Sequence, residues 1–221
     1  MTSSTLGDIT DANGQNKSAG HIRRRQEAAI LRAAEEEFAS FGFKGARMAE
    51  IAKKADLPKA NIHYYFKNKL GLYIALLSDV LKLWDHTFSN VTADDDPAEV
   101  IKAYIDEKMT FSRQHPLASR IFATEIISGA PNMRTYFDQR YRDWFAGRTD
   151  VLKAWIKQGK MDDISAEHLI FIIWASTQHY ADFSTQVASA LGKEGLDDSD
   201  YQAATDTLTH IILKGCGVKG S

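Results

Sequence analysis

Side chains that could contact a nucleic acid are concentrated between residues 47 and 69. Lys59 can donate to the acceptor atoms of guanine, and Asn61 can pair with adenine or a phosphate. His63 and Tyr64 can donate to backbone phosphates, which fixes the register of a helix against the bases. The candidate DNA-contacting residues are Arg47, Lys59, Ala60, Asn61, His63, Tyr64 and Lys69. This set predicts a short helix that reads the major groove of double-stranded DNA.

A second set of side chains could line a site for a small ring-shaped molecule. Trp174, Thr177 and Gln178 follow an i, i+3, i+4 spacing, so they are expected to share about one face of a helix. A flat polar ring such as a nucleobase could stack on the tryptophan and exchange hydrogen bonds with the glutamine amide. Alternatively, the tryptophans are ordinary core residues and a neighbouring helix satisfies Gln178. The candidate ligand-binding residues are Trp84, Tyr73, Phe122, Glu125, Trp174, Thr177 and Gln178.

Both sets require helices, and the apolar residues recur at helical spacing almost throughout. We therefore expect an all-α fold of about nine helices. A stripe ending at Gly42 predicts a first helix over 22–41, and Pro58 suits the start of a third. Met48, Ile51 and Ala52 mark a short second helix, which a break at 55–58 separates from a short third helix at 59–66. This is the outline of a helix-turn-helix. Further helices are predicted at 68–89, 98–114, 117–128, 132–158, 165–190 and 199–214.

Three segments follow from this pattern. Residues 1–20 are polar and are expected to form a disordered arm, 21–68 the helix-turn-helix DNA-binding domain, and 69–221 the ligand-binding and dimerisation domain. Residues 1–70 carry 12 Lys and Arg against 8 Asp and Glu, net +4, whereas the rest carries 15 against 21, net −6. A basic N-terminal segment followed by an acidic remainder suggests that only the N-terminal segment binds a polyanion, although uneven charge can also arise by chance.

The composition disfavours several other classes of protein. A lone cysteine, Cys216, excludes an intrachain disulfide or a cysteine-based zinc site, and scattered histidines offer no metal-ligand spacing. Neither a signal peptide nor a long apolar span is recognisable, so we expect a cytoplasmic protein without a membrane segment. Glycine-rich phosphate loops and nucleophile elbows are not found, so neither a cofactor nor catalysis is expected.

Two stretches, 41–52 and 61–69, closely resemble the DNA-binding domain of TetR-family regulators: their aromatics, glycines, Ile-Ala pair and Tyr-Phe…Lys ending match in order. Residues 168–183 resemble more specifically the regulators of pyrimidine utilisation within that family. The resemblance implies a homodimeric regulator, expected to be a repressor, that binds a palindromic operator and responds to a small molecule. The implied effector is a pyrimidine such as uracil or thymine, governing nucleobase catabolism.

The chain departs from the family pattern at three positions. Ala46 stands where a Thr or Ser usually caps the second helix, Asp56 stands where the turn commonly has Gly, and His63 replaces a frequent Tyr. A missing cap costs about 1 kcal/mol. Asp tolerates a left-handed φ better than most residues. These changes affect the operator contacts more than DNA binding itself.

A dimer interface is predicted on the helix at 165–190, which is apolar around most of its first half. With the last helix it could form a four-helix interface across a two-fold axis, unless it is central to its own monomer. The residues concerned are Leu169, Ile170, Ile172, Ile173, Trp174, Leu208, Ile211 and Ile212. Two alternative functions are a TetR-type regulator of a bulky apolar inducer, such as a drug or acyl chain, and a helical protein-interaction module.

Overall fold

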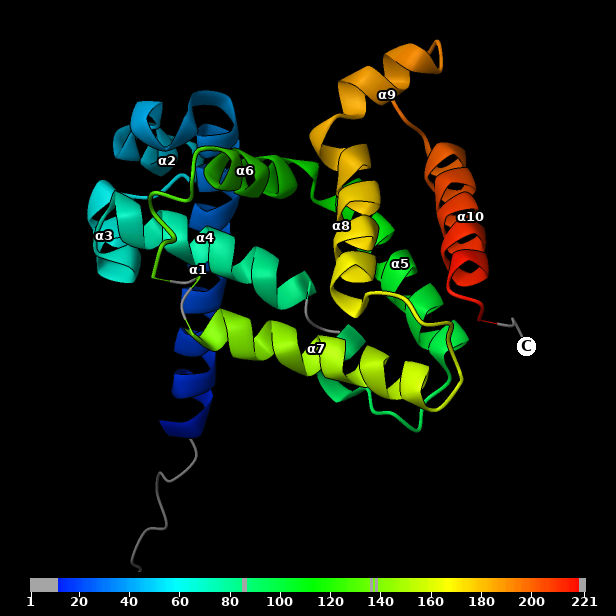
Figure 1. The fold of residues 1–221 in the computed structure, drawn as a ribbon. Helices are drawn as coiled ribbons and strands as arrows, with labels where there is room; N and C mark the ends of the chain where they lie inside the picture. Colours follow the sequence, from blue (N-terminus) through cyan, green and yellow to red (C-terminus); the bar gives the residue numbers. More distant parts are fainter. Residues whose placement is uncertain (1–11, 85–86, 136, 138, 219–221) are drawn as a thin grey trace, which may run out of the picture. The chain divides into compact units, whose positions relative to one another are not determined.

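The computed structural model describes residues 12–84, 87–135, 137 and 139–218, and these form ten α-helices and one 3-10 helix without a β-strand (Figure 1). The predicted all-α class is confirmed, with one helix more than expected. The elements are α1 (Ala12–Gly45), α2 (Met48–Lys54), α3 (Lys59–Phe66), α4 (Lys69–Trp84), η1 (Thr87–Asn90), α5 (Pro97–Gln114), α6 (Pro116–Ile127), α7 (Gln139–Lys157), α8 (Ala166–Asp182), α9 (Ser184–Ala190) and α10 (Asp198–Gly215).

The chain divides into two compact units, Met1–Ala75 and Leu76–Ser221. Helix α4 begins in the first unit and continues into the second. In the first unit, Ile30 and Phe38 of α1 share a core with Ile51 of α2 and Ile62 of α3. Ile30, Ala34 and Phe38 recur every four residues of α1, and Ile62 and Phe66 are four residues apart in α3. This is the amphipathic pattern expected of helices that bury one face.

Gly42 and Asp56 are two of the three positive-φ residues in the described part of the first unit, and the third is Lys67. Gly42 has φ 64° and interrupts the helical geometry of α1 near its end. Asp56, between α2 and α3, has φ 52°, so it occupies the left-handed conformation for which glycine is usual. The N–H of Leu57 then donates to the carbonyl of Ala52. The turn therefore satisfies the carbonyls at the end of α2 despite lacking glycine.

The second unit is built around α5 and α8, which pack against each other and against α10 (Figure 1). Its core includes the fully buried Trp155 of α7 together with Ile105 of α5 and Ile173 of α8. Because the central helix α8 contacts α5, α6, α7 and α10, its side chains are divided between several neighbours.

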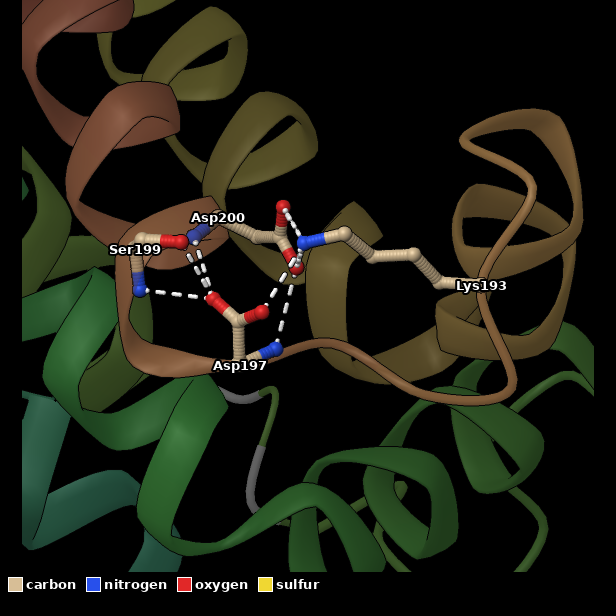
Figure 2. A network of polar contacts seen from close by, with 4 residues as sticks. All are labelled: Lys193, Asp197, Ser199 and Asp200. Carbon is tan, nitrogen blue, oxygen red and sulfur yellow. Dashed lines mark hydrogen bonds and ion pairs between the residues drawn. The ribbon is translucent and has the colours of Figure 1, made fainter.

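A polar network fixes the beginning of α10 (Figure 2). Asp197 accepts hydrogen bonds from the N–H groups of Ser199 and Asp200, and the Asp200 carboxylate accepts from the N–H of Asp197. Lys193 bridges both carboxylates, at 2.9 Å from Asp197 and 2.7 Å from Asp200. This reciprocal capping box satisfies N–H groups that have no partner inside the helix.

The structure corrects four helix boundaries. Helix α1 begins at Ala12, before the predicted start at 22, and residues 1–11 of the predicted arm lie outside the described part. Extending an existing helix costs little once its nucleus has formed. Residues 87–90 form η1 and do not continue α4, and α7 begins at Gln139 and not at 132. In the loop before α7, the backbone N–H and side-chain amide of Asn132 donate to the Glu125 carboxylate. The helix predicted at 165–190 is two, separated at Phe183.

Within the described segments, no helix combines the length and apolar character needed to cross a bilayer.

Candidate DNA-binding face and ligand cavity

Helix α3 has one face in the core and one face in solvent. Ile62 and Phe66 are buried, and Tyr65 is half-buried with its hydroxyl donating to the Gln26 side chain at 2.8 Å. Tyr64 points outward and is 72% exposed. The exposed residues of α3 are Lys59, Ala60, His63 and Tyr64, and Asn61 is half-buried. Tyr65 and Phe66 therefore hold α3 in place. The exposed side chains of Lys59, His63 and Tyr64 remain available to contact DNA.

An arginine of α1 adds positive charge to this face. The guanidinium of Arg23 lies 6.0 Å from the ring centres of both Tyr64 and Tyr65, at cation–π distance. Arg47, at the start of α2, is also exposed, and its guanidinium lies 4.0 Å from Glu50. Arg23 belongs to the run Arg23-Arg24-Arg25, which contributes to the positive charge of the first segment.

Two candidate DNA contacts are already used within the protein. The Lys69 ammonium donates to the carbonyl of Lys44 at 3.1 Å and lies 5.1 Å from the ring centre of Phe43. The Nδ1 atom of His63 lies 2.9 Å from the carbonyl oxygen of Lys67. Lys69 thus links the start of α4 to the end of α1. The Nε2 atom of His63 is the ring nitrogen that could contact DNA, because Nδ1 lies against the Lys67 carbonyl.

Glu37 of α1 positions α2. Its buried carboxylate accepts from the backbone N–H of Arg47 at 3.2 Å and forms an ion pair with Lys54 at 3.0 Å. The Ala46 side chain has no acceptor for a backbone N–H, and the Arg47 side chain makes no capping hydrogen bond. The Glu37 carboxylate, from another helix, therefore supplies the acceptor at the N-terminal end of α2. A negative group there is also favoured by the helix dipole.

The second unit contains a cavity of about 370 Å³ between α4, α5, α6, α7 and α8. A volume of this size suits a small ring-shaped molecule. Its lining is rich in aromatic rings and carries a few polar groups: Ser78, Leu81, Lys82, Tyr104, Lys108, Phe122, Tyr141, Trp144, Trp174 and Gln178. The cavity thus combines stacking surfaces with hydrogen-bonding groups.

Trp174 is the centre of the aromatic wall. Its ring lies 6.2 Å from that of Trp144, with the two planes inclined by 21°. Its indole N–H donates to the hydroxyl of Tyr104, and the Lys108 ammonium lies 5.9 Å from its ring centre. Gln178 is half-buried one turn further along α8. The indole is therefore oriented by a partly buried hydrogen bond, and its ring borders the cavity.

Three of the seven candidate ligand residues line the cavity: Phe122, Trp174 and Gln178. Tyr73 instead packs in the first unit, 4.9 Å from the ring centres of both Phe38 and Phe43. The Glu125 carboxylate binds Asn132. The side chain of Trp84 lies outside the described residues.

Thr177 is buried away from the cavity. Its hydroxyl donates to the carbonyl of Ile173 at 2.7 Å, and its own carbonyl accepts from the Ser112 hydroxyl of α5. Successive residues of a helix project about 100° apart, so Thr177 and Gln178 cannot both face one cavity. Thr177 packs against α5, and Gln178 faces the cavity.

The sequence-based candidates omitted seven lining residues: Ser78, Leu81, Lys82, Tyr104, Lys108, Tyr141 and Trp144. For α5 a signal existed, because Tyr104 and Lys108 lie on the stripe that also carries Ile101 and Ile105. A lysine within the apolar stripe of an amphipathic helix is a mismatch that marks a special environment. No comparable signal distinguished Tyr141 and Trp144 from ordinary core aromatics.

The α8 and α10 surface is apolar over a smaller area than predicted. Leu169, Ile170 and Ile173 are buried within their own unit, and Trp174 lies at the cavity. Ile172 remains exposed, as does Ile211 of α10, and both border a shallow groove. Helix α8 is therefore central to its monomer and also presents an apolar strip to solvent.

Comparison with known proteins places this geometry in context. Residues 30–76 match the family described as bacterial regulatory proteins, tetR family, and residues 77–219 match the YcdC-like protein C-terminal region. The HTH-type transcriptional regulator RutR of Escherichia coli O157:H7 is 38% identical over 205 residues, which cover 91% of this chain and 97% of RutR. The repressor NicS of Pseudomonas putida is 27% identical, covering 82% of this chain and 86% of NicS.

A solved structure has the same fold. The transcriptional regulator SCO4942 from Streptomyces coelicolor superimposes with a TM-score of 0.67 at 23% identity, covering 87% of this chain and 98% of that chain. The structural likeness therefore covers both units of the chain.

Proposed function

This chain belongs to the TetR family of bacterial regulatory proteins and is closely related to RutR, and from that premise we propose that it is a homodimer whose affinity for a palindromic operator is controlled by a pyrimidine bound in the cavity. Uracil and thymine are the proposed effectors, and repression of nucleobase catabolism is the proposed outcome. The observation that carries this proposal is the pairing of Trp174 with Gln178 in the wall of a cavity of about 370 Å³.

The chemistry of the lining favours a flat, polar ring. Trp174 and Trp144 offer aromatic faces, and a bound pyrimidine gains dispersion and stacking energy from them. An amide side chain offers both a donor and an acceptor, which matches the adjacent carbonyl and N–H groups of a pyrimidine edge. The resemblance of residues 168–183 to regulators of pyrimidine utilisation supports the same ligand class.

The DNA-binding proposal rests on the exposed face of α3. A symmetric operator requires two such faces held about 34–36 Å apart, so a dimer is part of the proposed mechanism. The strip containing Ile172 and Ile211 is the proposed interface. Helix α4 is the proposed lever, because it is covalently continuous from one unit to the other. A coupling of about 1–3 kcal/mol would change operator affinity roughly 5- to 150-fold.

Calorimetric titration of the purified full-length protein tests the ligand. We expect uracil or thymine to bind and to raise the thermal midpoint, whereas purines and an acyl-chain control do not. Gln178→Ala removes the paired hydrogen bonds and is expected to abolish binding. Stabilisation by the acyl chain in place of the pyrimidines would reject the proposed effector and favour a regulator of apolar inducers.

Operator binding tests the DNA face separately. Lys59→Ala and Tyr64→Ala truncate exposed side chains, so they are expected to lower operator affinity without lowering the free energy of unfolding. Retention of full operator affinity in both variants would contradict a role for α3 in recognition.

A further inference from the structure

Lys108 is the unusual member of the cavity wall. It is 2% exposed, and it lies on the stripe of α5 that otherwise builds the core. Lys82, the other lysine among the described lining residues, differs from Lys108 in having a largely exposed side chain. Burying an ammonium group costs several kcal/mol, and an apolar side chain of similar shape would avoid that cost. A lysine at this position therefore calls for an explanation other than stability.

We propose that Lys108 is the specificity-determining residue of the cavity and that its ammonium group donates a hydrogen bond to a carbonyl or anionic oxygen of the bound ring. This inference deepens the proposed function, on whose cavity it rests. It assigns a ligand class, a small planar ring bearing a strong acceptor oxygen, and it excludes rings and chains that lack one. Trp174 would supply the stacking surface beside the same ammonium.

The electrostatics around Lys108 support this role. Burial lowers the pKa of Lys108 to about 7, while Glu107 on the same helix and Asp182 of α8 partly oppose the shift. The Asp182 carboxylate accepts a hydrogen bond from the Ser119 hydroxyl. Burial raises the pKa of Asp182, and the interactions with Ser119, Arg120 and His179 partly oppose that rise. The remaining charged or titratable groups among the described lining residues are Lys82, Tyr104 and Tyr141.

A proton linkage follows from this placement. Above pH 7 the empty cavity holds Lys108 largely neutral, whereas an acceptor oxygen favours its ammonium form. Binding at pH 8 should therefore take up close to one proton, and binding at pH 6 should take up little. Because protonation must precede or accompany binding, affinity should fall about tenfold between pH 6 and pH 8.

Titration calorimetry with uracil and thymine, at both pH values and in two buffers of different ionisation enthalpy, measures the proton uptake directly. Lys108→Met keeps the length of the side chain without its charge. We expect this variant to lose about 10- to 100-fold in affinity at pH 6, as for a hydrogen bond to a charged group, and to show no proton uptake. Lys102→Met is the control, because Lys102 is an exposed lysine of the same helix outside the cavity lining, so this variant should retain both the affinity and the proton uptake.

The folding of the variant is checked by thermal denaturation and operator binding. If Lys108→Met does not fold, Lys108→Gln and the proton uptake of the wild-type protein still test the proposal. Binding of uracil without proton uptake and with full affinity in the Lys108 variants would overturn the role of Lys108 and leave the pyrimidine effector standing.

A separate pair of probes applies if neither pyrimidine binds. Benzoate and benzyl alcohol are rings of similar size, and benzoate alone carries an anionic oxygen. Preferential binding of benzoate that Lys108→Met abolishes would support Lys108 while rejecting the pyrimidine effector. Equal or absent binding of the two probes would overturn the inference.

Discussion

At the scale of single residues, Asp56 holds a conformation that its side chain does not favour. Its φ of 52° costs a non-glycine residue about 1 kcal/mol, which a glycine partly avoids. Asp56→Gly is therefore expected to raise the free energy of unfolding by about 0.5–1 kcal/mol, measured by urea denaturation.

Ala55 is the matched control because it precedes Asp56 with an ordinary φ of −76°. Ala55→Gly adds only chain entropy to the unfolded state and should destabilise the protein. Equal destabilisation by both substitutions would show that the left-handed turn is not the relevant feature.

Glu37 is the second residue with a large expected effect. Glu37→Ala removes the acceptor for the Arg47 N–H and leaves Lys54 without its 3.0 Å partner. We expect a loss of about 2 kcal/mol in the free energy of unfolding, less than for a fully buried pair because the Lys54 side chain is one-third exposed.

Two variants isolate the cause of that loss. Glu36→Ala removes an exposed carboxylate 3.9 Å from the same lysine and should change stability little. Glu37→Gln preserves an acceptor and should fall between the two. A loss from Glu36→Ala as large as that from Glu37→Ala would argue against the buried position as the source of the effect.

At the scale of elements, the start of α10 depends on ionised carboxylates. The Ser199 hydroxyl and the Lys193 ammonium hold the pKa of Asp197 below its usual range. A lowered pKa contributes stability that is present above the unfolded value, near 4, and is lost as pH falls toward the folded value. Asp197→Ala should thus lower the thermal midpoint at pH 7 more than at pH 3.

Asp206 provides the comparison within the same helix, because its carboxylate accepts from Gln202 on the exposed surface and takes no part in capping. Asp206→Ala should shift the midpoint little at either pH. A pH-independent effect of Asp197→Ala would mean that the capping box does not depend on its charge.

At the scale of the whole molecule, the proposed dimer requires the strip on α8 and α10. Ile211→Glu places a charge on a side chain that is 59% exposed in the single chain and would be desolvated in a dimer. We expect dissociation into folded monomers, measured by analytical ultracentrifugation, together with a loss of operator affinity.

Ile127 of α6 is 81% exposed and lies outside the groove that Ile211 borders, so Ile127→Glu is the matched control. It should leave the oligomeric state unchanged. A dimer that survives Ile211→Glu but not Ile127→Glu would relocate the interface.

The sequence by itself determined the all-α class, the core faces of α1, α2 and α3, and the turn that separates α2 from α3. These features depend on local periodicity and on residues such as Gly42 and Pro58, whose backbone preferences act over a few positions. Trp174 and Gln178 were placed on one face by their spacing of four residues, whereas Thr177, predicted on the same face, packs against α5.

Tertiary structure alone decided which side chains from different helices meet. Tyr73 packs in the first unit, whereas Trp144 and Tyr141 line the cavity. Helical periodicity does not distinguish an aromatic residue that packs in a core from one that lines a cavity. The break at Phe183 carries no glycine or proline signal. Lys108 interrupts the apolar stripe of α5 in the sequence, but its place in the cavity wall beside Trp174 is known only from the structure. Contacts between distant segments are set by packing and burial, which local spacing does not encode.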